Sequence, residues 1–131
     1  MAIPNIINRS GKLDNGHGRT IPQAALLEEV DLAATKTEVG LDLVGPIGAM
    51  TATLTVTAAA GTTPTLDVIV EHSHDGSTWA TLGSFTQATA ATAETKTFGP
   101  VRRYIRGKAT VGGTTPTFSF TLSADLDISY I

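Results

Sequence analysis

The sequence predicts an all-β protein: a single antiparallel β-sandwich, jelly-roll-like, with seven or eight strands. Apolar and polar residues alternate along most of the chain after residue 38, as they do in strands that bury one face. Turn residues such as Gly45-Pro46 and Asp75-Gly76 interrupt this alternation at roughly ten-residue intervals. Only 5% of the residues are aromatic, which favours thin, layered packing over a large aromatic pocket.

The chain of 131 residues is long enough for one domain of ordinary size. We expect residues 1–37 to form an extended N-terminal arm and residues 38–131 to form the sandwich domain. The first part of the arm is polar and rich in Gly, so it cannot bury enough apolar surface to fold alone. Farther along, Pro22 and the run from Gln23 to Glu29 fit a short helix, while the residues from Val30 to Ala33 fit an edge strand equally well.

The alternation assigns strands in order after the arm. The first runs over residues 39–44, and the strand over 51–58 has an apolar face and a threonine face. An Asp-Gly turn joins strands over 66–73 and 79–84. A polar loop over 87–94 leads to a strand at 95–98, and a last hairpin pairs 103–111 with 117–128. The predicted core comprises Leu54, Val56, Leu66, Val68, Val70, Trp79, Leu82, Ile105, Phe118, Phe120 and Leu122.

One hexapeptide occurs twice with a single change. The segment from Gly61 to Leu66 reads GTTPTL, and the segment from Gly113 to Phe118 reads GTTPTF. Each follows a Thr-Val strand end and precedes an alternating strand, and proline at the head of a strand avoids the loss of a ladder hydrogen bond. We interpret the repeat as two structurally equivalent hairpins rather than as a duplicated binding site.

Composition excludes several classes of function. The 12 acidic and 9 basic residues give a formal charge of −3, so the whole molecule has no electrostatic attraction to nucleic acid. The chain has no Cys, which excludes disulfides, thiolate metal sites and Cys nucleophiles. We find no basic leader followed by a long apolar run, and no apolar run long enough to cross a membrane. The protein is expected to be made in the cytoplasm and to leave it only as part of a larger assembly.

No catalytic or metal site is expected. His72 and His74 would share one face of a strand and could chelate zinc, but further ligands are not evident. We therefore place His72 at the rim of the sandwich and His74 in the turn. Asp125 and Asp127 lie together on the polar face of one predicted strand, and no Ser or Thr stands in a nucleophile-elbow context. The chain is predicted not to be an enzyme and to carry no cofactor.

Two groups of residues are candidates for a protein interface. Arg102, Arg103, Arg106 and Lys108 form a basic cluster that could dock on an acidic protein surface or on phosphate, or could be the solvated charge of an edge strand. Apolar residues in the arm have no periodicity of their own, so a groove on a neighbouring chain would best bury them. The candidate interface residues are Ile3, Ile6, Ile7, Leu13, Arg102, Arg103 and Arg106.

Three stretches resemble a known group of proteins. These are the run from Val70 to Phe85 (VEHSHDGSTWATLGSF), the segment from Val101 to Arg106 (VRRYIR), and the Gly-Gly-Thr-Thr-Pro hairpin. Together they resemble small β-sandwich structural proteins of tailed bacteriophages, most closely the capsid decoration (cement) proteins. The resemblance covers about residues 50–124. The S-x-D-G-x-T-W turn also occurs in discoidin-like and other sugar-binding sandwiches.

The resemblance implies a virion component that binds and stabilises the lattice of the major capsid protein. The partners would be the major capsid protein and copies of this chain, without direct contact to nucleic acid or membrane. The location would be the virion, after synthesis in the host cytoplasm. Two alternatives stay open: a tail or head–tail connector protein, and a carbohydrate-binding module in which Trp79 and Tyr104 make a weak contact with host-surface glycan.

Overall fold

Two long, paired strands dominate the structure. The computed structural model describes residues 23–130, and the side chains of 24–126; in this part of the chain all regular structure is β, arranged as one seven-stranded antiparallel sheet. The strands are β1 (Gln23–Leu32), β2 (Lys36–Thr37), β3 (Leu41–Asp42), β4 (Ile47–Ser73), β5 (Ala80–Ser84), β6 (Thr92–Phe98) and β7 (Tyr104–Tyr130).

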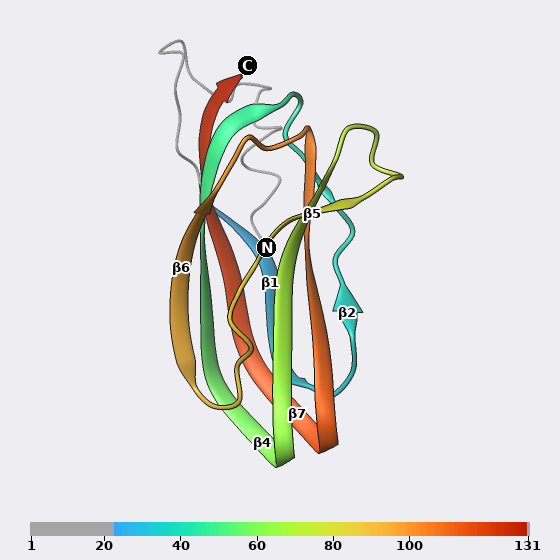
Figure 1. Ribbon diagram of the computed structural model, residues 1–131, viewed down its shortest axis with the longest axis vertical. Helices are drawn as coiled ribbons and strands as arrows, with labels where there is room; N and C mark the ends of the chain where they lie inside the picture. The colour runs from blue at the N-terminus through green and yellow to red at the C-terminus, as the bar shows by residue number, and fades with distance from the viewer. Residues whose placement is uncertain (1–22, 131) are drawn as a thin grey trace.

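The sheet is folded over on itself to make two layers. In Figure 1, β4 and β7 both reverse direction at the lower end of the molecule. The first half of β4 and the second half of β7 form one layer with β1 and β6, and the other halves form the second layer with β2, β3 and β5. The layers pack face to face: a Cβ on Gly107 would meet the side chains of Leu27 and Leu122 in the opposite layer. A long antiparallel pair bent in this way is a β-sandwich of jelly-roll type, as the sequence predicted.

The two bends are built from the repeated hexapeptide. Gly61 and Gly113 have φ angles of 110° and 114°, and Thr63 and Thr115 have φ angles of 46° and 47°. Thr62 pairs with Thr114 across the two bends. The equivalence of the two repeats, predicted from the sequence, is therefore present as two matching corners. They join the layers rather than forming separate hairpins, because the ladder between β4 and β7 continues through them.

The core lies between the layers and matches most of the prediction. Nine of the eleven predicted core residues are no more than 2% exposed, and Leu82 packs against the core while half-buried. The prediction for Trp79 was wrong, because its indole is only half-buried and lies outside the core cluster. The buried core residues are Leu54, Val56, Leu66, Val68, Val70, Ile105, Phe118, Phe120 and Leu122.

The expectation for the segment after Pro22 also needs correction. Residues Gln23–Leu32 form β1 and pair with β7, so no helix forms there, and the sheet begins before residue 38. A β-bulge between Ala25 and Leu27 allows the consecutive residues Leu26 and Leu27 both to be buried. Adjacent buried leucines break the period of two that marks a strand, and Pro22 before this run fitted the first turn of a helix. No helix in the described part of the chain is long and apolar enough to span a membrane.

Candidate protein interface

A rigid turn follows the end of β4 and carries the only Trp of the chain. The hydroxyl of Ser73, which is fully buried, accepts hydrogen bonds from the backbone N–H groups of Asp75 and Gly76, at 3.2 and 2.9 Å. Oδ1 of Asp75 accepts hydrogen bonds from the N–H groups of Ser77 and Thr78, both at 2.9 Å, and from the Ser73 hydroxyl. These bonds lower the pKa of Asp75 to about 2. The turn is therefore held by its own side chains, as expected for an Asx-type turn.

Trp79 emerges from this turn and is covered on one face by Arg106. The guanidinium carbon of Arg106 lies 4.2 Å from the centroid of the Trp79 ring. Nε of the same arginine donates a 2.7 Å hydrogen bond to the carboxylate of Glu71, and both charged side chains are largely buried. The cation–π contact and the ion pair fix the Arg106 side chain in one position.

Tyr104 and Arg103 extend the same surface. The guanidinium of Arg103 lies 5.0 Å from the centroid of the Tyr104 ring, and Nε and Nη2 of Arg103 donate to the two carboxylate oxygens of Asp42 at 2.8 and 2.9 Å. This bidentate pair lowers the pKa of Asp42 and raises that of Arg103. The Tyr104 ring also lies beside Gly76, since a Cβ added to this glycine would be 3.7 Å from the ring. We call Trp79, Arg103, Tyr104 and Arg106 the arginine–aromatic surface.

The arginine–aromatic surface borders a cleft that also exposes an aliphatic side chain. The cleft has a volume of about 440 Å³. Val39 is 89% exposed and stands beside it, while the edge of the Trp79 ring packs against Gly40. A second hollow of about 230 Å³ shares Val39, Gly40 and Arg106. The cleft is lined by Val39, Gly40, Asp75, Gly76, Trp79, Tyr104 and Arg106.

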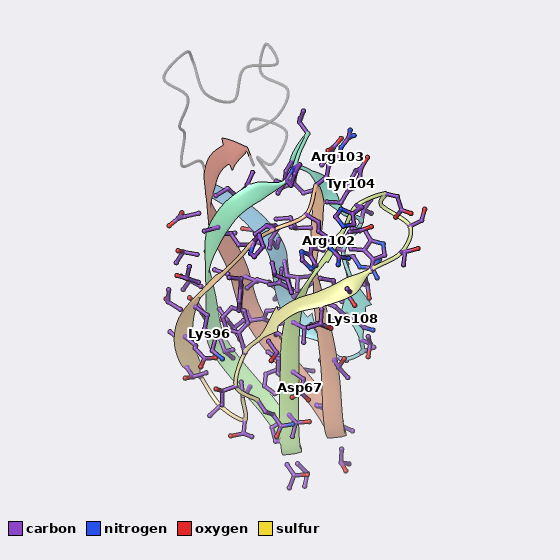
Figure 2. All side chains as sticks on the ribbon, turned by 45° about the horizontal axis from the view of Figure 1, so that its top comes forward. Asp67, Lys96, Arg102, Arg103, Tyr104 and Lys108 are labelled. Carbon is purple, nitrogen blue, oxygen red and sulfur yellow. The ribbon has the colours of Figure 1, made fainter. Side chains whose placement is uncertain are left out.

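The three arginines predicted as interface residues do not form one basic strip. Figure 2 shows Arg102, Arg103 and Tyr104 at one end of the molecule, with Lys108 farther along β7. Arg103 and Arg106 are paired with acids, whereas Arg102 makes no ion pair with any described residue and lines a different cleft. The four arm residues proposed for the same role, Ile3, Ile6, Ile7 and Leu13, lie outside the described residues.

The histidines are placed at the rim and in the turn, as the sequence indicated. His72 is half-buried near the end of β4, and His74 is exposed in the turn. Among the described residues, no three His, Cys, Asp or Glu side chains are grouped so that they could hold a metal ion.

Sequence reasoning did not find several members of the site. Asp42 on β3 neutralises Arg103, which lies just before β7. Glu71 on β4 neutralises Arg106 on β7. Alternation cannot reveal such pairs because it gives the face of a residue but not the register between strands. The register places Glu71 opposite Arg106. Val39 was assigned to a strand by its alternation, but residues 38–40 form no strand and leave it exposed.

No protein-family model matches the sequence, and no curated protein is detectably similar to it. Solved structures do share the fold. The PBSX exported protein XepA superimposes with a TM-score of 0.55 at 14% identity, over 79% of this chain and 36% of XepA. A protein of the T13 particle of IBDV (infectious bursal disease virus) gives 0.50 at 12% identity, over 88% of this chain and 35% of its own. Murine APRIL superimposes with a TM-score of 0.52 at 9% identity, over 82% of this chain and 99% of APRIL.

These similarities establish the class of fold. The chain is an all-β sandwich of a kind found in a phage exported protein, in a virus particle and in a murine protein. It spans about a third of the length of the first two neighbours. One sandwich fold serves many roles, so the role of this chain has to be argued from its surface.

Proposed function

We propose that the protein is a structural component of a virus particle, and specifically a capsid decoration protein of a tailed bacteriophage. In this role it binds the lattice of the major capsid protein, and copies of itself, on the outside of the virion, after synthesis in the host cytoplasm. The role is one of binding and needs no catalytic group or cofactor. The neighbours from PBSX and from the IBDV particle support a viral setting for the fold.

The arginine–aromatic surface is the observation that carries this proposal. Trp, Tyr and Arg are the residues most enriched among those that dominate the binding energy of protein interfaces. Here Arg106 is already held by Glu71 and by the Trp79 ring, so little side-chain entropy remains to be lost on binding. Val39 adds an exposed aliphatic side chain next to this preorganised group.

The same geometry argues against a flat sugar-binding platform. Sugar rings stack on open aromatic faces, but one face of Trp79 is covered by Arg106, and the Tyr104 ring contacts Arg103 and Gly76. Two alternatives were left open by the sequence. A tail or connector protein could use this surface as an interface, whereas a carbohydrate-binding module would need the aromatic faces to be open. Position in the particle distinguishes capsid from tail.

A binding assay with particles that lack the protein tests the proposed surface. Purified protein is mixed with such particles, and the bound fraction is measured after sedimentation. Val39→Glu places a charge beside the cleft and is expected to weaken binding about tenfold. Val30→Glu is the matched control, because Val30 is also strongly exposed, at 82%, but does not line the cleft. Equal binding by both variants and the unaltered protein would show that this surface is not the interface.

The contribution of the N-terminal arm is tested in the same assay. We propose that burial of Ile3, Ile6, Ile7 and Leu13 by a neighbouring subunit adds to the affinity, at roughly 1.5–3 kcal/mol for each side chain before the cost of ordering the segment. Deletion of residues 1–20 leaves β1 intact, since β1 begins at Gln23. The truncated protein is expected to stay folded and to lose binding. Undiminished binding would exclude the arm as an affinity element.

A further inference from the structure

A second cleft, separate from the arginine–aromatic surface, combines cationic groups with an apolar floor. It has a volume of about 490 Å³ and shares no lining residue with the cleft beside Trp79. Arg102, His72 and His74 contribute the basic groups. The other lining residues are Pro46, Thr81, Leu82, Gly99, Pro100 and Val101, and most of these are apolar.

The basic groups of this cleft are not neutralised within the described part of the chain. Arg103 and Arg106 each hold a carboxylate, but the Arg102 guanidinium has no acidic partner among the described residues. Nearby acids are engaged elsewhere: Glu71 is bound to Arg106, and Asp75 is bound within its own turn. On a molecule with a formal charge of −3, this cleft is a local concentration of groups that attract an anion.

The hydrogen bonding of His72 leaves a donor for a ligand. Nδ1 of His72 accepts a 3.2 Å hydrogen bond from the backbone N–H of Arg102, so the ring proton of the neutral imidazole is on Nε2. Burial, Arg102 and His74 lower the pKa of His72. The residues opposite His72 on the neighbouring strands, Ala80 on β5 and Ile105 on β7, are uncharged. Among the described residues, Arg102 and His74 are the charged or basic groups that act on His72, and both disfavour its protonation.

We propose that this cleft binds a carboxylate presented by an acidic segment of a partner protein. Arg102 would receive the carboxylate in a charge-assisted contact, with His72 and His74 as further donors. The apolar floor from Pro46, Leu82, Pro100 and Val101 favours a peptide with an apolar side chain next to its acid over a free inorganic anion. A bound carboxylate would neutralise Arg102, which no acidic side chain does among the described residues.

Peptide titration of the full-length protein tests this site. The probe is an acetylated peptide of alternating Leu and Glu flanked by Gly and Ser, and the control is the same peptide with Gln in place of Glu. Binding is followed by NMR through the imidazole resonances of His72 and His74. We expect saturable shifts with the Glu peptide alone. Arg102→Gln is expected to weaken binding about tenfold, while Lys96→Gln, which removes a cation outside both clefts, leaves it unchanged.

Each other outcome overturns a defined part of the proposal. Absence of shifts at millimolar Glu peptide, or equal shifts with the Gln peptide, would show that the cleft does not bind carboxylates. A third titration uses inorganic phosphate: affinity equal to that of the Glu peptide would assign the cleft to small anions instead of a protein segment. None of these results depends on particles, so the cleft can fail while the proposed virion role stands, and the reverse.

Discussion

The guanidinium of Arg106 lies over the Trp79 ring, with its carbon 4.2 Å from the ring centroid, while its Nε donates a 2.7 Å hydrogen bond to the carboxylate of Glu71. Three residues from β4, the turn and β7 are thereby locked together at the surface of the sandwich. The arrangement explains why the only Trp of the chain is half-buried rather than in the core. It also fixes the shape of the cleft that we propose as an interface.

Removal of Arg106 is expected to destabilise the fold. Arg106→Ala leaves the largely buried Glu71 carboxylate without its partner and removes the cation–π contact, so the free energy of unfolding should fall by about 1–3 kcal/mol. Urea denaturation measures this loss. Arg103→Ala is the control, because its ion pair with Asp42 is exposed and should contribute much less. Equal losses in the two variants would contradict the locked geometry.

The paired corners predict that replacing either of two glycines by alanine destabilises the fold. A Cβ at Gly61 would lie 2.6 Å from the carbonyl oxygen of Thr115, and one at Gly113 would lie 2.6 Å from that of Thr63. Both glycines also have positive φ angles, so each Gly→Ala change should cost about 1–3 kcal/mol of stability. Gly48→Ala is the matched control, since a Cβ there meets nothing within 4 Å. If thermal denaturation finds all three variants equally stable, the corners are not built as described.

Truncation of a central core residue tests the register of β7. Phe120 is 2% exposed and lies between the layers, so Phe120→Ala should cost about 3–5 kcal/mol, enough to unfold a marginally stable domain. Thr55→Ala, on the exposed side of β4, should change stability by less than about 0.5 kcal/mol. An unchanged melting temperature for the Phe120 variant would refute this register.

The turn before Trp79 should respond to acid at an unusually low pH. Hydrogen bonds to the ionised carboxylate lower the folded-state pKa of Asp75 from 3.8 to about 2. Their stabilising contribution is therefore complete above the unfolded-state value of 3.8, and it is lost as the pH falls through about 2. NMR titration of the Asp75 side-chain carboxyl carbon should give a midpoint near 2. A midpoint near 3.8 would show that the turn is open in solution.

Local patterns predicted the fold well and the surface poorly. The alternation that includes Phe118, Phe120 and Leu122 gave the buried face of β7 directly, because a residue's face depends only on its own strand. Strand β1 was not predicted for its full length, because its bulge places two adjacent leucines on the buried face and breaks the alternation. Trp79 was misplaced because its burial depends on Arg106, which is distant in sequence.

The ion pairs of the candidate site could not be predicted from local sequence patterns either. Glu71 meets Arg106 because β4 and β7 pair in one register, and a shift of one residue would separate them. The cleft around Arg102 likewise depends on pairing, since Arg103 and Arg106 hold acids and Arg102 holds none among the described residues. Composition gives the number of charges but not their pairing.

The location and copy number of the protein in purified particles test the central claim most directly. Quantitative mass spectrometry gives the ratio of this chain to the major capsid protein, and electron cryomicroscopy of normal particles and of particles lacking the gene locates the difference density. A decoration protein predicts many copies arranged over the outer capsid lattice. Absence from the particles would contradict a virion role, and density confined to the neck or tail would contradict the capsid assignment.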